Sequence, residues 1–600
     1  MAEQFLNIKN LKFILHDVIA TDDGHREAAF AGKNRKTIDM VLDAAYDFAK
    51  KELHPIFEEM DRNQPELKDG IVKVHPKVKN IMRTLGRDGW IAAGFSEEWD
   101  GENMPASIIH ACSYIFAAAN YSGSVYAGLS MGAAKLIDSF GDMALKQEYI
   151  PKLLSGEWQG TMALTEPEAG TSLSDMTTEA VSQDNGSYRV KGQKIFISAG
   201  DHDAVDNVIH LMLARIKGAP AGVRGISLFV VPKLRQDVSG TFVSNDVTVT
   251  QVFHKLGYRG APITELSMGD KDDCHAFLVG EVNMGLKYMF QMMNGARLEV
   301  GMGAAAISTA AYHAALNYTK SRKQGRRITD KGSANPVSII EHADVKRMLL
   351  FQRAVSEGSL ALILQCSYYE DLITILPKEE REDYHFLLEL LTPVAKTYPA
   401  EMGILSTSQS IQCFGGYGYC EDFPVEQHFR DMRIHTIHEG TTGIQGMDLL
   451  GRKVVMNNGK VLTLLGEKIG ETIAVGKKVS ELSEMAFSLE QAFTLIASST
   501  EALGAVAMEK GAEAFLADAT LYLEMFGHVV IAWQWLKQAV VATEKLSSEK
   551  IKKMDKAFFE GKLSVCQYFY RYELPKASTI AGIITQGTAT ALSVEAVHFS

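Results

Sequence analysis

The hydrophobic period of this chain changes twice, and these two changes constrain its fold more than any other feature. Residues 36–160 carry apolar positions at helical spacing, with charged side chains on the opposite face. From residue 161 the apolar runs are short, β-branched or aromatic, and Gly, Pro and Asn-Asp separate them. Helical spacing returns after residue 280. We therefore predict an α+β fold that is mostly α, in the order helices, β domain, helices.

The 600 residues are enough for roughly three to five domains. A Gly- and Asn-bearing link, VVMNNGKVL, precedes the last helical stretch. We predict an N-terminal extension (1–35), a helical domain (36–160), an antiparallel β domain (161–280), a helical bundle domain (281–455) and an additional C-terminal helical domain (456–600).

The β domain contains one strong turn signal. Asp184-Asn185-Gly186 lies between the runs TTEAVSQ and SYRVKG. It predicts a hairpin with a type I′ turn, because that turn needs residues that tolerate positive φ at both central positions. Strands of this kind form either a barrel or a packed sheet, and both alternatives stand at this point.

The net charge and the cysteine spacing disfavour nucleic-acid binding, a disulfide framework and a zinc site. The formal net charge is −12, whereas nucleic-acid binders usually carry a basic stripe. The six cysteines show no CxxC spacing, which fits neither a disulfide framework nor a zinc site. We expect a reduced, cytoplasmic protein without a metal site and without nucleic acid. The start lacks a signal-peptide pattern, and the absence of a run of about twenty apolar residues predicts no transmembrane segment.

Two stretches at the start of the β domain have the residues to contact a ligand. In MALTEPEAGTSLSD, Thr165 supplies a hydroxyl and Gly170 permits a close backbone approach. In KIFISAG, Phe196 is able to stack on a ring while Ser198 hydrogen-bonds to it. The alternatives are an ordinary strand-to-loop exit and routine strand residues.

Two later stretches suit an anionic group. YTKSRKQGR places Arg322 near the end of a long helix, where it suits a pyrophosphate, although a lone arginine is more often a surface ion pair. QCFGGYGYCEDFPVEQHFRDMRIHTIHEGTTG opens with Gly415 and Gly416, which let backbone amides approach a flat or anionic ligand. Its spacing is not GxGxxG and no strand precedes it, so a Rossmann fold is not indicated.

The same stretch ends with a single carboxylate, Glu439, between an apolar run with two histidines and Gly-Thr-Thr-Gly. Taken alone, Glu439 fits a helix start, because Thr441 and Thr442 precede the periodic run IQGMDLLGRKVV and an acid favours the helix dipole there. The competing interpretation is a catalytic carboxylate with a perturbed pKa.

Together the four stretches resemble the acyl-CoA dehydrogenase family over roughly residues 40–455. LKFILHDVI, LVGEVNMGLKYMFQMMNGARLEVG and the extra C-terminal domain resemble the long branch that contains 3-methylmercaptopropionyl-CoA dehydrogenases. The resemblance implies an N-terminal helical domain, a β domain, a four-helix bundle and the additional helical domain. It also implies FAD-dependent α,β-dehydrogenation of an acyl-CoA thioester to the 2-enoyl-CoA.

The resemblance assigns roles to individual residues. Glu439 matches the base that takes the α-proton while the flavin N5 takes the β-hydride. Ala296 occupies the position of an alternative base and cannot accept a proton. Positions that match FAD contacts are Leu164, Thr165, Gly170, Phe196, Ser198, Arg322, Gln324, Gln412, Gly415, Gly416, Thr441 and Gly443. Positions that match substrate contacts are Thr171, Asn294, Arg297 and Gly440.

The resemblance also implies partners. The substrate is expected to be a short- or medium-chain acyl-CoA or one of the 3-methylthiopropanoyl type, and the electron acceptor an electron-transfer flavoprotein. The alternatives are an acyl-CoA oxidase that uses dioxygen and a noncatalytic flavin-binding assembly protein of the same fold. A homodimer is expected, with the tetramer of shorter members as the alternative.

The last 145 residues carry aromatic helix faces that include Phe526, Trp533 and Trp535. An isolated helical domain would struggle to cover such a surface. We therefore predict that residues 456–600 pack on the rest of the protein.

Overall fold

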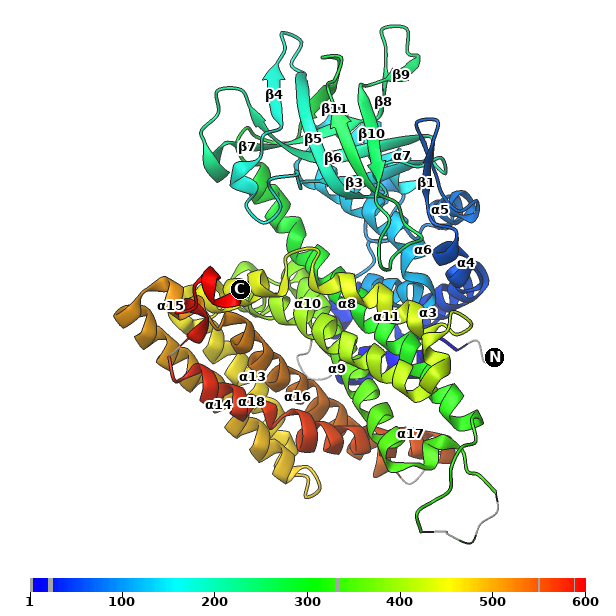
Figure 1. The fold of residues 1–600 in the computed structure, drawn as a ribbon, viewed down its shortest axis with the longest axis vertical. Coiled ribbons are helices and arrows are strands. Elements are labelled where there is room, and N and C mark those ends of the chain that lie inside the picture. The colour runs from blue at the N-terminus through cyan, green and yellow to red at the C-terminus, as the bar shows by residue number, and fades with distance from the viewer. Residues whose placement is uncertain (1–3, 20–24, 330–331, 333–334, 549–550, 588) are drawn as a thin grey trace. The chain divides into compact units, whose positions relative to one another are not determined.

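The computed structural model describes residues 4–19, 25–329, 332, 335–548, 551–587 and 589–600. The chain divides into two compact units, whose elements are labelled in Figure 1. The sheet unit contains Ala44–Met104 and Ile115–Ala296, and the helical unit contains Met1–Asp43, Pro105–Tyr114 and Arg297–Ser600. The finer boundaries at residues 35, 160, 280 and 455 stay predictions.

The sheet unit is built on one eight-stranded sheet, ordered β10-β11-β5-β12-β7-β6-β3, with β4 paired to both β5 and β6. Because β4 joins β5 to β6, the strands β4, β5, β12, β7 and β6 form a closed ring of paired neighbours. The ring corresponds to a barrel, which decides between the two arrangements that the sequence left open. The strands are Trp158–Ala163 (β3), Glu179–Ser182 (β4), Tyr188–Ser198 (β5), Asn207–Ile216 (β6), Ile226–Pro232 (β7), Val247–Val252 (β10), Ile263–Met268 (β11) and His275–Leu278 (β12).

The predicted antiparallel β domain is confirmed for most of its strand pairs, but two pairs are parallel. β3 runs parallel to β6, with Trp158 opposite Asn207, and β4 also runs parallel to β6. Hydrophobic period reports which face of a strand is buried, and it carries no information on the direction of a neighbour that is about fifty residues away. Two short antiparallel ladders accompany the sheet: Glu66–Lys68 (β1) with Ile71–Lys73 (β2), and Leu234–Gln236 (β8) with Phe242–Ser244 (β9).

The predicted hairpin is confirmed, but its turn is of another type. β4 and β5 pair antiparallel on either side of the turn. Only Gly186 has a positive φ (82°), and its N–H donates to the carbonyl of Gln183 at 3.1 Å. A type I turn followed by one left-handed glycine explains this geometry, whereas a type I′ turn would also need a positive φ at Asn185.

Helices of the N-terminal segment accompany the sheet. The apolar stretch predicted as a buried helix pair forms one long element, α6 (Ala106–Phe140), which is broken at Asn120. The Asn120 Oδ1 accepts the N–H of Gly123 at 2.9 Å, so Asn120 starts the second half as a helix cap would. The other helices of this region are Arg35–Phe48 (α3), Phe57–Arg62 (α4), Lys77–Arg87 (α5) and Met143–Leu154 (α7).

The helical unit is centred on two long antiparallel helices, α9 (Ala343–Ile375) and α10 (Lys378–Phe414), joined by Leu376 and Pro377. Such a short link places the two helices side by side. The part of α8 (Gly285–Ser321) that belongs to this unit, together with α11 (Val425–Met432) and α12 (Thr442–Asp448), completes the region that carries Arg297, Arg322 and Glu439.

The prediction that residues 456–600 pack on the rest of the protein is confirmed. Phe526, Trp533 and Trp535 are buried, and the Trp535 Nε1 donates to the carbonyl of Ala354 on α9 at 3.0 Å. The domain's helices are Lys460–Gly476 (α13), Ser483–Lys510 (α14), Ala512–Leu516 (α15), Ala519–Leu546 (α16), Lys553–Tyr568 (α17) and Lys576–Ile584 (α18).

The N-terminal extension packs on this C-terminal domain. It contains α1 (Ile8–Phe13) and a π-helical turn at Ile14–Val18, followed by α2 (Arg26–Ala29). The Phe13 ring makes edge contacts with Phe558 and Phe559 at centroid distances of 5.5 and 5.7 Å. The two ends of the chain therefore share one core.

One helical segment of the described chain, Ala512–Leu546, is long and apolar enough to cross a membrane by length and composition. The sequence did not indicate this segment, because polar residues interrupt its apolar run. More than half of its most apolar stretch (56%) is buried, and it includes the Trp535 contact with α9. These contacts are those of a core helix.

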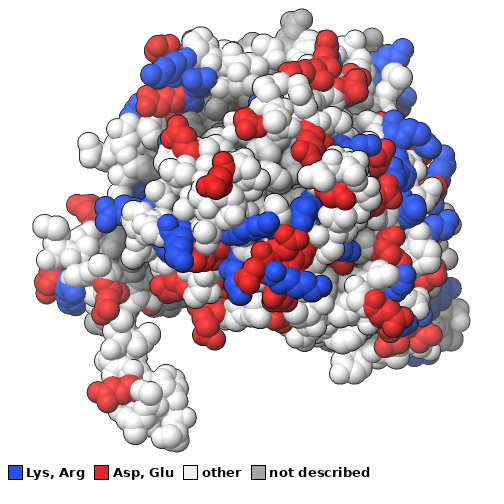
Figure 2. Space-filling view, turned by 90° about the horizontal axis from the view of Figure 1, so that it is seen from above, with Lys and Arg blue, Asp and Glu red and all other residues white. Residues whose placement is uncertain are grey.

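Acidic and basic side chains are interspersed on the face shown in Figure 2. On this face no broad stripe of one sign runs across the described residues. The negative net charge is thus distributed rather than gathered there.

Candidate active site

The Glu439 loop lies just before a helix and has an unusual backbone. α12 begins at Thr442 with Thr441 as its N-cap, so the predicted helix start is confirmed, and Glu439 lies outside the helix. Glu439 has a φ of 53° and Gly440 a φ of 94°, both in the left-handed region. A left-handed backbone is rare for a glutamate, and such strain is typical of functional sites.

Three side chains hold this loop. The Lys396 Nζ donates to the Gly440 carbonyl at 2.8 Å, and the Gln445 Nε2 donates to the Glu439 carbonyl at 3.0 Å. Glu401 accepts the hydroxyl of Thr442. Lys396 and Gln445 are fully buried. The sequence analysis missed all three, and the available signal was the presence of two charged residues, Lys396 and Glu401, in the largely apolar helical run LLTPVAKTYPAEMGIL.

The electrostatic surroundings suit a base. Burial by the surrounding protein raises the pKa of the Glu439 carboxyl, while the charges of Arg297 and Lys396 oppose that rise. The residue nevertheless keeps an exposed surface, through which a substrate has access. Burial lowers the pKa of His435 to about 4 and that of His438 well below its usual range, so both rings are neutral near pH 7.

Arg297, predicted to contact the substrate, is engaged elsewhere. Its guanidinium forms an ion pair with Asp448 on α12 at 2.8 Å, and the residue is only 4% exposed. This pair ties α8 to the helix that follows the Glu439 loop. Asn294, the other predicted contact on α8, is half-buried one turn earlier. Glu299 lies two residues after Arg297 and meets the His110 Nε2 at 3.2 Å.

The structure brings together the two stretches at the start of the β domain. The Ile195 N–H donates to the Thr165 carbonyl at 2.9 Å, and the Lys194 Nζ donates to the Leu164 carbonyl at 3.0 Å. Lys194 also forms a buried ion pair with Glu166 at 2.8 Å. Leu164 and Thr165 are thereby fixed against the strand that carries Phe196 and Ser198.

The end of that strand has features of a ring-binding surface. Phe196 has a φ of 58° and is 59% exposed, although large apolar side chains in strands are usually buried. Ala199 is also left-handed, with a φ of 49°, and Ser198 between them is half-buried. Gly170 and Thr171 are exposed on the loop after Thr165.

The structure also brings together the two anion-binding candidates within the helical unit. The Arg322 guanidinium lies over the ring of Tyr417, 6.0 Å from its centroid, and its Nη2 donates to the Gln324 Oε1 at 3.3 Å. Tyr417 belongs to the glycine turn in which Gly415 has a φ of 62°. Exposed residues in these segments include Arg322, Gln324, Gln412, Gly415 and Gly416.

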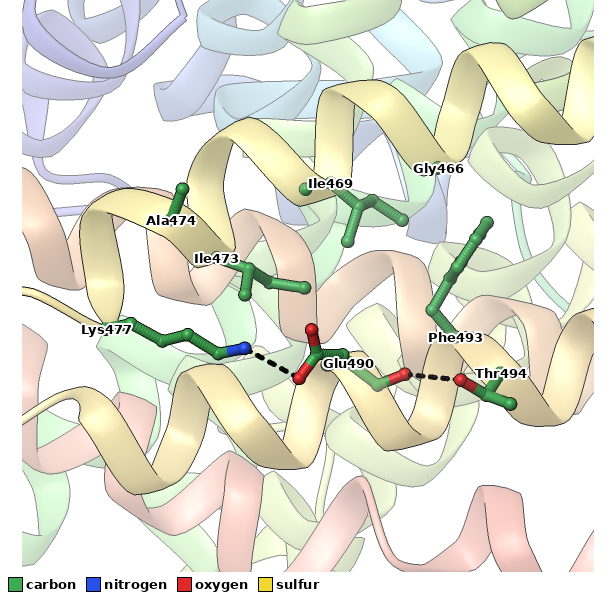
Figure 3. A pocket seen from close by; sticks show the side chains of 9 residues that line it. Gly466, Ile469, Ile473, Ala474, Lys477, Glu490, Phe493 and Thr494 are labelled. Atoms are coloured by element: carbon green, nitrogen blue, oxygen red, sulfur yellow. Dashed lines mark hydrogen bonds and ion pairs between the residues drawn. The ribbon is translucent and has the colours of Figure 1, made fainter.

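A separate groove of about 320 Å³ lies between α13 and α14 (Figure 3). Ile469, Ile473 and Phe493 give it an apolar floor, and the Lys477 Nζ meets the Glu490 carboxylate at 2.7 Å on its rim. It contains none of the predicted site residues. Throughout the described ranges, no three His, Cys, Asp or Glu side chains gather as metal ligands.

Four family models match the chain in the order that its architecture suggests. Residues 35–157 match the acyl-CoA dehydrogenase N-terminal domain, 161–270 the middle domain, and 283–454 the C-terminal domain. Residues 465–595 match the acetyl-CoA dehydrogenase C-terminal-like domain. The chain is also 35% identical over 540 residues to 3-methylmercaptopropionyl-CoA dehydrogenase of Ruegeria pomeroyi, covering 90% of both chains.

The chain belongs to the acyl-CoA dehydrogenase family. It is 31% identical to the broad-specificity linear acyl-CoA dehydrogenase FadE5 of Mycobacterium tuberculosis, covering 96% of this chain and 97% of that protein. The fold matches the crystal structure of an acyl-CoA dehydrogenase complexed with FAD from Bacillus anthracis, with a TM-score of 0.73. That match covers 96% of this chain and 92% of the other at 19% identity.

Acyl-CoA dehydrogenases are FAD-dependent, and the residues present here fit that cofactor. The exposed Phe196 and the half-buried Ser198 lie on the same strand, and the neighbouring loop adds Thr165. These are the groups that contact a flat heteroaromatic ring. In the helical unit, Arg322 and the glycine turn offer the charge and the backbone amides that suit a pyrophosphate.

Proposed function

We propose that this acyl-CoA dehydrogenase converts an acyl-CoA thioester to the 2-enoyl-CoA, with Glu439 as the base that removes the α-proton. The observation that carries this proposal is the Glu439 loop. The residue keeps an exposed surface, the pKa of its carboxyl is raised by burial, and its left-handed backbone is held by Lys396 and Gln445. A general base works best when its pKa lies near the working pH.

The chain's own groups account for the proton transfer. Glu439 accepts the α-proton, and the rings of His435 and His438 are neutral near pH 7, so they add no charge to those of Arg297 and Lys396 in its surroundings. We assign the Glu439 backbone N–H as a donor to the thioester oxygen, where negative charge develops. Gly440 and Thr441 leave room for the thioester.

The same proposal assigns the cofactor contacts. Leu164, Thr165, Gly170, Phe196 and Ser198 would hold the ring system. FAD supplies, when bound, the acceptor for the β-hydride. The ADP half would meet the remaining predicted contacts, which are Arg322, Gln324, Gln412, Gly415, Gly416, Thr441 and Gly443.

The substrate is proposed to be a short- or medium-chain acyl-CoA or one of the 3-methylthiopropanoyl type, with Thr171 and Asn294 on its CoA side. Support comes from the relatives, one of which is named for 3-methylmercaptopropionyl-CoA and another for linear acyl-CoAs. The test is a panel of acyl-CoAs ranked by flavin bleaching, and preference for long-chain substrates would contradict the proposal. Reoxidation by an electron-transfer flavoprotein but not by dioxygen would distinguish the dehydrogenase from an oxidase.

We further propose a homodimer located in the cytoplasm. The six cysteines are free in the structure, as expected in a reducing compartment. Light scattering of the purified holoenzyme is expected to give twice the mass of the chain. A monomer or a tetramer would contradict the dimer.

Replacement of the proposed base tests the function directly. Glu439→Gln removes the proton acceptor and nearly preserves size, so FAD and acyl-CoA should still bind. Bleaching of the flavin band after anaerobic mixing should slow by at least about a hundredfold, the low end for the loss of a general base. Glu299→Gln is the matched control, since Glu299 is a carboxylate on α8 that pairs with His110, and it should retain the wild-type rate. Wild-type bleaching in Glu439→Gln would refute the assignment.

A further inference from the structure

Lys396 is an unusual residue for the middle of a long helix. It lies on α10, between Pro393 and Pro399, and its side chain is fully buried. Removing a lysine charge from water is costly unless partners compensate. Its Nζ donates a hydrogen bond to the Gly440 carbonyl at 2.8 Å, next to the proposed base.

The contact lies at a left-handed stretch of the backbone. Glu439 and Gly440 are consecutive left-handed residues, and a carbonyl bond to each comes from a buried side chain. The Lys396 bond fixes the Gly440 peptide, and the Gln445 bond fixes the Glu439 peptide. An ammonium donor to a carbonyl is a strong, charge-assisted hydrogen bond.

We propose that Lys396 is a positioning residue for Glu439: its ammonium group anchors the loop that carries the base and places a positive charge near the carboxylate. This inference rests on the proposed function of Glu439. Lys396 would then fix the geometry of the loop and also influence the charge of the base. It lies outside the sequence motifs on which the family resemblance rests.

Charged and titratable groups from α8, α10, α12 and the segment before Glu439 affect the ionisation of Glu439 directly or through its cationic neighbours. Arg297 from α8 and Lys396 from α10 favour the ionised form of Glu439. Glu401, also on α10, interacts with Lys396, and Asp448 on α12 neutralises Arg297. The histidines of the preceding segment, His435 and His438, are neutral near pH 7. Removal of the Lys396 charge should therefore raise the pKa of Glu439, as removal of the Arg297 charge would.

The sign of the effect follows from Coulomb's law. A nearby cation favours the carboxylate, so its removal raises the pKa of Glu439. Burial lowers the pKa of Lys396 to about 8, so the charge is present below that pH. Loss of the charge should therefore move the acidic limb of the pH–rate profile to higher pH.

The test uses the FAD-loaded full-length enzyme and two substitutions. Lys396→Met removes the charge and the hydrogen bond at similar volume, whereas Lys396→Gln removes the charge and keeps an N–H donor. Anaerobic flavin bleaching by one saturating acyl-CoA is followed from pH 5.5 to 9. We expect both variants to shift the acidic limb upward by about one unit. We also expect Lys396→Met alone to lose about tenfold or more of the high-pH rate, because a displaced base is a poorer catalyst.

The matched control is Lys562→Met. Lys562 is likewise a fully buried lysine of the helical unit, and its Nζ bonds to Glu357 at 2.6 Å and to Gln538 at 2.7 Å. Burial lowers its pKa to about 8 as well. Loss of Lys562 should lower the melting temperature without moving the acidic limb. If Lys396 were merely structural, its variants would behave in the same way, and an unmoved limb in Lys396→Gln overturns the proposal.

Failure of this inference is distinguishable from failure of the proposed function. If Glu439→Gln bleaches at the wild-type rate, Glu439 is not the base and the function proposal fails. If Glu439→Gln is inactive and the Lys396 variants keep the wild-type limb, only the role of Lys396 fails. Should Lys396→Met not fold, Lys396→Gln alone carries the test, because the limb reports the charge.

Discussion

Position 440 in the Glu439 loop accepts few residue types other than glycine. Its φ of 94° lies in a region that L side chains rarely adopt, and a Cβ built there would lie 2.5 Å from the Gln445 Nε2. Gln445 cannot move away without releasing the Glu439 carbonyl that it bonds. Backbone conformation and local space therefore both require glycine at position 440.

Gly440→Ala should accordingly displace Glu439 while leaving the carboxylate in the protein. We expect flavin bleaching to slow on the order of a hundredfold, as for a reacting group misplaced by about 1 Å. The matched control is Gly504→Ala on α14, where an added Cβ meets nothing within 4 Å and φ is not positive. That variant should keep the wild-type rate. Equal rates in both variants would show that the loop tolerates a side chain.

At the level of elements, the contact between α9 and α16 holds the C-terminal domain on the bundle. Gly358 on α9 permits the approach, since a Cβ there would lie 2.8 Å from both the Ile531 Cγ2 and the Trp535 Nε1. The Trp535 indole is fully buried and bonds to the Ala354 carbonyl. Small and large residues thus interlock across this helix pair.

Trp535→Ala should remove the largest side chain from this contact. We expect a loss of unfolding free energy of about 3–5 kcal/mol, the usual cost of truncating a buried aromatic residue. Chemical denaturation followed by tryptophan fluorescence and circular dichroism measures it. Met508→Ala, at a residue that is 91% exposed, is the control and should change stability by less than about 0.5 kcal/mol. A Trp535→Ala protein as stable as the control would contradict the assigned packing.

For the whole molecule, buried histidines set the response to acid. Burial lowers the pKa to about 3 for His202 and His210 and to about 4 for His313 and His435. Below about pH 6.5 the unfolded chain binds protons at these positions and the folded chain does not. Each therefore reduces stability as pH falls, by about 1.4 kcal/mol per pH unit once its unfolded form is fully protonated. Asp371, whose pKa burial raises to about 7, acts in the opposite direction.

Among the described residues, the histidines with a lowered pKa outnumber the carboxyls with a raised pKa, which are Glu148, Asp371 and Glu439. We therefore expect the melting temperature to fall steadily from pH 7 to pH 5. His210→Asn should make the decline shallower, because it removes one titrating ring and keeps a polar partner for the Thr161 hydroxyl, now 2.7 Å from His210. Scanning calorimetry at constant ionic strength is the measurement. A melting temperature that stays constant or rises over this range would contradict the prediction.

Features that depend on neighbours along the chain could be predicted from the amino-acid sequence. Hydrophobic period located the β domain between helical segments, and the Gly186 turn placed β4 beside β5. The threonines after Glu439 marked the start of α12. The burial of Trp533 and Trp535 on α16 could be predicted because a helix face of this kind is rarely left exposed to water, whichever part of the protein packs against it. In each case a few consecutive residues carry the physical cause.

Features that join residues far apart in the chain could not be predicted, and they are seen only in the folded protein. The parallel pairing of β3 with β6 and the closure of the strand ring depend on where the chain returns, which local period does not encode. The pairing of Arg297 with Asp448 likewise joins positions about 150 residues apart. Lys396 lies 44 residues from the carbonyl that it bonds. Lys396 is able to anchor the loop because folding buries its ammonium group within hydrogen-bond distance of the Gly440 carbonyl.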